Sequence, residues 1–424
     1  MEQGSDYEKS DAGSISCAAH VTAGEPEPGS SVIVNGDYPE GVWRAWSTVI
    51  GAWLILCCSV GMTSAFGVYQ DFYVSDRLSN YSASSISWIG GVQIFLELIL
   101  GPIGGKLFDV GYIRAANIAG CTLFTLSFFM LSLSQPQQYY QVFLAQGVGM
   151  GAGIGILYVP ASAVVSHHFR SHRALAMSIL LNHLMHGPVG FVGGTRIVAS
   201  ITLICFVLGN VLISVPRIQR PAVTPKTTFL DAPYILTVSW GFVASLGMYF
   251  PAFYLQLFAR IHGIHSRLAF YSLAIMNAAS VFCRVLPNWL ADVWGKMEVF
   301  VPCATIGGLV AFGMIGCTTP LRIVIFAISY GFFFGASVAL YLPVIDSMTP
   351  PGADTGKRMG MALVPVGIAC LVGPPTAGAI LGSQHQWWKG IVFASVTDTA
   401  PCVLLGAALV IWRRSRDRGE INKV

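Results

Sequence analysis

Charge is the scarcest property of this 424-residue chain. Only 10% of its residues are Asp, Glu, Lys or Arg, whereas 54% are hydrophobic. Soluble domains average about 25% charged residues, so the chain has too few charged side chains to cover a water-exposed surface. The composition excludes a soluble globular protein and indicates one that lies in a bilayer.

Spaced cysteine pairs and catalytic motifs are also missing. The ten cysteines show neither the spacing of a zinc site nor a disulfide framework, and we interpret them as small buried hydrophobes. No Ser-His-Asp set, metal-ligand spacing or nucleotide motif is present, and the basic residues are spread over short loops. We therefore expect no metal, no cofactor, no nucleic-acid partner and no enzymatic activity.

Long apolar stretches fill most of the chain. A membrane-spanning helix needs about 20 mostly apolar residues, and twelve stretches meet that requirement. They cover residues 45–66, 85–104, 115–133, 141–164, 174–192, 197–215, 234–255, 268–291, 300–317, 323–344, 360–381 and 391–411. In the fourth stretch, Gly147 to Gly155 places glycine at every second position, which predicts close helix packing. It is no phosphate loop, because no Lys-Ser/Thr follows.

Two halves of the sequence repeat each other. The loop that contains Asp109 has a counterpart around Asp292, 183 residues later, and Tyr158 with its following proline matches Tyr341 at the same offset. One offset for two independent matches indicates duplication. We predict an all-α membrane protein of two six-helix bundles related by pseudo-twofold symmetry, the arrangement of the major facilitator fold.

The predicted domain organisation follows from these stretches. Residues 1–40 are rich in Ser, Gly, Pro and acidic residues, which predicts a disordered cytosolic tail without a cleavable signal peptide. We expect an N-terminal bundle at 41–215, a cytosolic linker at 216–232, a C-terminal bundle at 233–412 and a basic cytosolic tail at 413–424.

Charge in the loops predicts the orientation. With both termini in the cytosol, seventeen Lys and Arg lie on the cytosolic side and six outside, as the positive-inside rule requires. Asn80 then begins a glycosylation triplet in the first external loop, although such triplets also occur by chance. The plasma membrane is the expected location, with a vacuolar or other organelle membrane as the alternative.

The fifth stretch is short. Only 22 residues separate Arg173 from Arg196, and Pro188 interrupts them, whereas 30 separate Arg358 from Lys389 in the second half. Segment 174–196 is therefore either a short, kinked fifth helix or the site of a deletion in the gene model or allele.

Several motifs resemble one family. The segments beginning at Pro39, Phe66 and Ser87, the Gly-Lys-Leu-Phe-Asp loop ending at Arg114, and the later segments at 277–282 and 373–378 resemble fungal monocarboxylate-transporter-like permeases of the major facilitator superfamily. The resemblance covers residues 39 to about 412. It implies transport of a small organic solute, with protons in symport. Two departures weaken carboxylate transport: Ser64 stands where animal carriers have lysine, and Ser280 where they have aspartate.

Charged and polar residues within the stretches are the predicted site. Arg284, matched to the family's arginine, lies about 12 Å from the cytosolic end of its helix at 1.5 Å per residue. It should contact an anionic solute in a central cavity or form a structural ion pair. Further solute-contacting residues, which could instead bond between helices, are Asn277, Ser64, Tyr69, Gln70, Tyr158 and Tyr341.

Acidic residues have two predicted roles. Glu97 and Asp398 lie within apolar helices and could couple transport to protons, or be neutral and hydrogen-bonded. Asp109, Arg114, Asp292 and Lys296 are predicted to gate the cytosolic mouth, although both aspartates could simply end their helices.

These features predict a monomeric secondary transporter that moves a monocarboxylate or related organic anion by alternating access, possibly with H+. Efflux of a hydrophobic secondary metabolite by the same fold is the alternative. A non-transporting membrane sensor is an alternative of another class.

Overall fold

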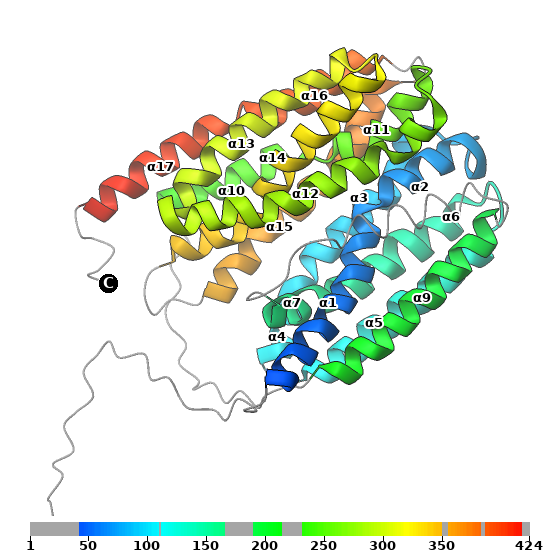
Figure 1. The fold of residues 1–424 in the computed structure, drawn as a ribbon, viewed down its shortest axis with the longest axis horizontal. Helices are drawn as coiled ribbons and strands as arrows, with labels where there is room; N and C mark the ends of the chain where they lie inside the picture. Colours follow the sequence, from blue (N-terminus) through cyan, green and yellow to red (C-terminus); the bar gives the residue numbers. More distant parts are fainter. Residues whose placement is uncertain are drawn as a thin grey trace, which may run out of the picture. The chain divides into compact units, whose positions relative to one another are not determined.

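The computed structural model describes residues 42–109, 112–165, 190–213, 231–349, 355–382 and 386–417, which all belong to one compact unit, Pro39–Val424. Within these ranges the structure is helical and contains no strand (Figure 1). The predicted all-α architecture is therefore confirmed. The tail at 1–40 and most of the fifth predicted stretch lie outside the described residues.

The first half contains α1 (Val42–Ser64), α2 (Phe66–Phe72), the π-helix η1 (Tyr73–Arg77), α3 (Ala83–Ile99), α4 (Gly101–Asp109), α5 (Ile113–Leu133), α6 (Tyr139–Val142), the π-helix η2 (Phe143–Met150), α7 (Gly151–Val165) and α9 (Gly190–Leu212). The second half contains α10 (Ala232–Ser245), α11 (Phe250–Ile261), α12 (Ser266–Trp294), α13 (Lys296–Phe312), the 3-10 helix η3 (Gly313–Gly316), α14 (Pro320–Ser347), α15 (Thr355–Leu381), α16 (Trp387–Thr399) and α17 (Cys402–Asp417).

Ten helical segments of the described residues are long and apolar enough to cross a membrane. They coincide with ten of the twelve predicted stretches. The eighth stretch corresponds to α12, whose 29 residues would span about 43 Å at 1.5 Å per residue. This helix carries the polar residues Arg267, Asn277 and Asn288.

Two predicted boundaries are wrong. The sixth span was predicted to begin at residue 197, but α9 begins at Gly190 and includes Arg196, whose Nε lies 3.4 Å from the Ser132 hydroxyl. A long arginine side chain near a helix end can carry its charge to the membrane surface, so Arg196 did not mark a loop. The first span was predicted to end at Phe66, but the helical path continues through α2 and η1 to Arg77.

The two halves share a pattern of helix contacts. In the first half α1 packs against α9, α5 against α7, and α3 against α7; in the second half the corresponding pairs are α10 with α17, α13 with α14, and α12 with α14. Because each pair in one half has its equivalent in the other, the structure shows the same duplication as the repeated sequence motifs. The halves meet where α2 contacts α11 and α3 contacts α15, a surface that we call the seam.

Alternate glycines of η2 and α7 face different neighbours. A Cβ added at Gly151 or Gly155 would meet backbone atoms of α3, whereas one added at Gly149 or Gly153 would meet α5. Residues four apart lie on the same helix face, so spacing glycines by two opens both faces to close packing. Such contacts matter in lipid, where helix association depends on packing rather than on the hydrophobic effect.

Replacing Gly155 by alanine should destabilise the first half, because the new Cβ would overlap the carbonyl oxygen of Leu96, a backbone atom that cannot rotate away. We expect a net loss of about 1–2 kcal/mol, from overpacking offset by alanine's better helix propensity. The measurement is thermal unfolding of the purified protein in detergent. Gly406→Ala is the matched control, because Gly406 lies in α17 with open space around it. An unchanged Gly155→Ala midpoint would contradict the packing account.

Candidate functional site

The first membrane-spanning path of each half is broken at a corresponding place. In the first half α1 ends at Ser64 and α2 begins at Phe66; in the second half α10 ends at Ser245 and α11 begins at Phe250. Of the repeated Gly-Met pairs, residues 247–248 lie in the second break, and residues 61–62 lie in the last turn of α1, just before the first break. Broken helices at matching positions of two repeats are where transporters bind solutes, because the breaks free backbone groups inside the membrane.

Side chains bond the freed carbonyl groups. Asn277 of α12 donates from its amide to the carbonyl oxygen of Ser64 at 3.3 Å, so this bond joins the two halves. In the second half the carbonyl oxygen of Met248 accepts a 2.6 Å hydrogen bond from the Tyr330 hydroxyl. The carbonyl oxygen of Ser64 at the first break therefore receives its hydrogen bond from the opposite half, and separation of the halves would break that bond.

A polar cluster lies next to the first break. The Thr63 hydroxyl donates to Oε2 of Glu97 at 2.9 Å, and the Gln93 amide donates to the Thr63 hydroxyl at 3.3 Å. Glu97 is buried in α3, the seam helix that contacts α15. This carboxyl group is placed to respond when the halves separate.

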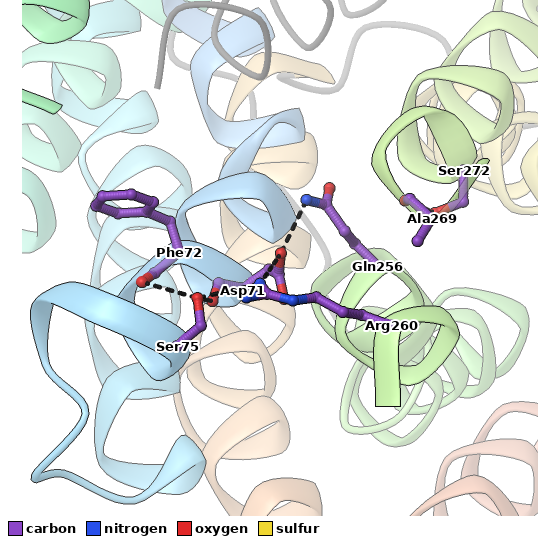
Figure 2. Close-up of polar contacts among 7 residues, drawn as sticks. All are labelled: Asp71, Phe72, Ser75, Gln256, Arg260, Ala269 and Ser272. Atoms are coloured by element: carbon purple, nitrogen blue, oxygen red, sulfur yellow. Dashed lines mark hydrogen bonds and ion pairs between the residues drawn. The ribbon is translucent and has the colours of Figure 1, made fainter. Parts of the chain in front are cut away.

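An ion pair joins the halves at one end of the seam. Asp71 of α2 accepts at Oδ2 from Arg260 at 2.9 Å and from the Gln256 amide at 3.1 Å, both on α11 (Figure 2). Arg260 also donates to the Ser75 hydroxyl at 3.1 Å. The Asp71 side chain is 2% exposed and that of Arg260 45%. We call Asp71, Ser75, Gln256 and Arg260 the seam latch.

Close backbone contacts continue the seam beside the latch. The Ser84 hydroxyl of α3 donates to the carbonyl oxygen of Pro375 in α15 at 2.6 Å, and Ser87 hydrogen-bonds with the Tyr254 hydroxyl. A Cβ at Gly67 would overlap the carbonyl oxygen of Ala252. The absence of a side chain at Gly67 thus lets α2 approach α11 closely enough for the latch to form.

The opposite end of the halves has a different arrangement. Asp292 and Arg114 are exposed, and Lys296 pairs with Asp346 of its own half at 3.4 Å. The backbone of Asp109 ends α4, but its side chain lies outside the described residues. Among the ion pairs of the described residues, Asp71–Arg260 is the one that joins the halves. The structure is therefore a conformer latched at the α2–α11 end, in which Lys296 pairs with Asp346.

Five of the seven predicted solute-contacting residues fall into two groups. Asn277, Ser64 and Tyr69 lie at or just beyond the first break. Helix-to-helix hydrogen bonds occupy the other two: the Gln70 amide donates to the Ala83 carbonyl oxygen at 3.0 Å, and Tyr341 donates to that of Ala362 at 3.2 Å. For Gln70 and Tyr341, the helix-bonding alternative describes this conformer, as it does for Asn277, which donates to the Ser64 carbonyl oxygen.

The remaining predicted residues are placed as follows. Tyr158 is half-buried in α7, and Asp398 is buried in α16 of the second half. Arg284 lies in α12, but its side chain is outside the described residues. Asn80 is exposed in the turn after η1, where a glycan would be accessible.

Sequence reasoning missed the seam latch. The positive-inside count places Arg260 among the six external loop charges, and Asp71 has no predicted role. A signal was present: Gln256 repeats Gln70, the neighbour of Asp71, and Arg260 follows Gln256 by one helical turn.

Comparison with known families decides the class of protein. Residues 51–353 match the family model described as Major Facilitator Superfamily. The chain belongs to the Major Facilitator Superfamily. It is a multi-pass membrane protein and a secondary transporter of a small organic solute.

Relatives of this facilitator include named efflux proteins. The Aspyridones efflux protein apdF of Emericella nidulans is 34% identical over 398 residues, which cover 90% of this chain and 81% of that protein. The Agnestins efflux protein AgnL12 of Paecilomyces divaricatus is 35% identical over 378 residues, covering 84% and 87% respectively. The resemblance to monocarboxylate carriers is thus refined: the superfamily is confirmed, and these relatives are named for efflux.

Solved structures agree on the fold. The crystal structure of the nucleoside transporter NupG superimposes with a TM-score of 0.63 at 13% identity, covering 87% of this chain and 99% of that chain. Identity this low supports the facilitator fold alone.

Removing the two charges of the latch should have unequal effects. Arg260→Ala leaves the buried Asp71 carboxylate without its cation, whereas Asp71→Ala leaves Arg260, which is 45% exposed, free to turn toward water. We expect Arg260→Ala to favour separation of α2 from α11 by about 2–4 kcal/mol, and Asp71→Ala by less. Spin labels at Asn80→Cys and Ile261→Cys, both exposed, would report the distance between the turn after η1 and the end of α11.

The double variant Asp71→Ala/Arg260→Ala is the control. It should behave like Asp71→Ala, because no buried charge remains. Equal distance distributions for the Arg260→Ala protein and the protein with an intact latch would show that the ion pair does not keep α2 and α11 together.

Proposed function

We propose that this facilitator exports a hydrophobic secondary metabolite, of the kind for which its efflux relatives are named, by alternating access. The observation that carries the proposal is the neutral chemistry at the first helix break. Ser64 stands where the resembling carboxylate carriers place a lysine, and Ser280 where they place an aspartate. Ser280 donates to the carbonyl oxygen of Asn277 at 2.8 Å, so it acts as a neutral helix-bonding group.

Asn277 is the residue we assign to solute binding. In the latched conformer its amide bonds to the Ser64 carbonyl oxygen of the other half. When the halves move, that amide can donate to a carbonyl or hydroxyl oxygen of the solute instead. Hydrogen-bonding groups within an apolar site fix orientation without requiring a charged ligand.

Aromatic side chains offer the apolar contacts. Tyr249, at the second break, packs edge-on against Phe334 with ring centroids 5.5 Å apart. The series continues from Tyr249 through Phe253 to Phe66 in the other half, where the last two centroids are 4.7 Å apart. Such rings favour flat, conjugated solutes.

Orientation and coupling complete the proposal. The positive-inside rule places the α2–α11 end outside, so the latched form faces the cytosol and can load solute there. Glu97, which is buried and accepts from Thr63, remains our proposed proton-coupling residue. Asp109, Arg114, Asp292 and Lys296 remain proposed gates of the form that opens outward.

Uptake of a monocarboxylate with protons is the second candidate. It is favoured by the position of Arg284 on α12, which matches the family's arginine. We rank it below efflux because Ser64 and Ser280 remove two of the charged groups such a carrier uses.

An efflux assay tests the proposed function. Cells that lack their own exporters and express this chain should retain less of a labelled hydrophobic secondary metabolite than cells with an empty vector. Asn277→Ala should reduce the efflux rate about tenfold, as expected for the loss of one hydrogen bond of about 1.4 kcal/mol. Asn210→Ala is the matched control, because Asn210 bonds within the first half, to Cys121 and Phe206.

The alternative is tested in the same cells with labelled lactate and pyruvate. Accumulation of these acids, together with unchanged retention of every hydrophobic metabolite tested, would reject efflux and favour the monocarboxylate carrier.

A further inference from the structure

Two thiol groups meet where α1 packs against α9. The side chains of Cys58 in α1 and Cys205 in α9 hydrogen-bond with each other, and neither cysteine is in a disulfide. Cys58 is 3% exposed and Cys205 is half-buried. The pair lies within the first half of the chain, and neither the proposed solute site nor the seam latch includes it.

Backbone contact between the two helices fixes this pairing. A Cβ added at Gly209 of α9 would lie 2.7 Å from the carbonyl oxygen of Gly51 and 2.7 Å from Cγ1 of Ile55, both on α1. One helical turn from Ile55 is Cys58, and one turn from Gly209 is Cys205. A disulfide requires Cα atoms within about 7 Å of each other. Because the helices touch one turn away, the two sulfurs can bond after rotation of the side chains alone.

The surroundings of Cys205 exclude reagents that are dissolved in water. Its neighbours Ile204 and Leu208 are 58% and 50% exposed on the outer surface of the packed helices, where lipid lies. Cys205 follows Gly190, the start of α9, by fifteen residues and precedes Leu212, its end, by seven. These separations are about 22 Å and about 10 Å at 1.5 Å per residue. A reagent for this thiol must therefore dissolve in the bilayer or be attached to an acyl chain.

Oxidation suits the pair better than metal binding. Two cysteines hold a soft ion such as Cu(I) as thiolates, and a charged complex at this depth in lipid is costly. A disulfide is neutral and carries no such cost. Hydroperoxide groups on unsaturated acyl chains bring an oxidant that accepts two electrons to this depth of the membrane.

We propose that Cys58 and Cys205 form a dithiol site that reduces an acyl-chain hydroperoxide and becomes a disulfide. The more exposed sulfur, that of Cys205, attacks the terminal peroxide oxygen. The O–O bond breaks, and the lipid leaves as an alcohol that takes the thiol proton. The product is a sulfenic acid on Cys205, which condenses with a neighbouring thiol.

The second step closes the bond. The sulfur of Cys58 attacks the sulfur of Cys205, the S–O bond breaks, and the hydroxyl group leaves as water with the Cys58 proton. Two thiols are thus oxidised to one disulfide, while the hydroperoxide is reduced to an alcohol and water. Because both cysteines belong to the first half, this disulfide does not join the halves, and the site is independent of the solute and of the direction of transport.

Peptide mapping of the full-length protein tests the proposal. Reduced protein is placed in lipid nanodiscs that contain a phosphatidylcholine hydroperoxide, or in matched nanodiscs that contain the corresponding hydroxy lipid. Mass spectrometry of the unreduced digest should find the α1 and α9 peptides joined, with the loss of two hydrogens, in the hydroperoxide sample alone. One molecule of lipid alcohol should form for each disulfide, and a dithiol reductant should restore both thiols.

Variants assign the two steps. Cys58→Ser should stop the reaction at the sulfenic acid of Cys205, which dimedone would trap, and Cys205→Ser should leave Cys58 as a thiol. Cys57→Ser is the matched control, because Cys57 precedes Cys58 in α1 at the same depth. The Cys57→Ser protein should form the disulfide as the parent does.

A parent protein that keeps both thiols in the hydroperoxide nanodiscs would overturn the proposal, and that measurement depends on no variant. A disulfide that contains Cys57 in place of Cys58 would overturn the assigned pair. Oxidation by a membrane quinone without oxidation by the hydroperoxide would overturn the assigned oxidant.

Discussion

A buried charge in a membrane protein persists only where another group faces it, and in this facilitator that constraint joins the two halves. Asp71 lies buried on α2, and the cation that offsets its charge, Arg260, belongs to α11 of the other half. Neither half can satisfy the carboxylate alone, so the latched conformer depends on their contact. The same pair gives the transporter a place where contact can be broken by one substitution.

Packing brings these charges together. Gly67 lets α2 approach Ala252 of α11, and the glycines of η2 and α7 hold α3 and α5 in the first half. The hydrophobic effect contributes little to helix association in lipid. Close contacts between backbones therefore contribute more to fixing the helix positions than they would in a soluble protein. Polar bonds between the halves, such as Asn277 to Ser64, can break when the halves move without disturbing the packing within each half.

Much of the fold could be predicted from the sequence, because hydropathy and duplication are local or repeated signals. The site was harder to predict. Asn277 and Glu97 are recognisable as polar residues inside apolar helices, but the pairing of Asp71 with Arg260 joins positions 189 residues apart and depends on the register of two helices. Because Arg196 is charged, the sequence predicts a start of the sixth span after it, whereas α9 begins at Gly190. An arginine near a helix end can belong to the helix as well as to a loop.

Crosslinking across the seam tests the central claim most directly. A short, reducible thiol crosslinker between Asp76→Cys and Ile261→Cys should stop transport until it is cleaved, because the α2–α11 end must open in every cycle. A crosslink between Asn80→Cys and Gln135→Cys, both in the first half, should leave transport unchanged. Continued transport by protein that is fully crosslinked across the seam would contradict the account.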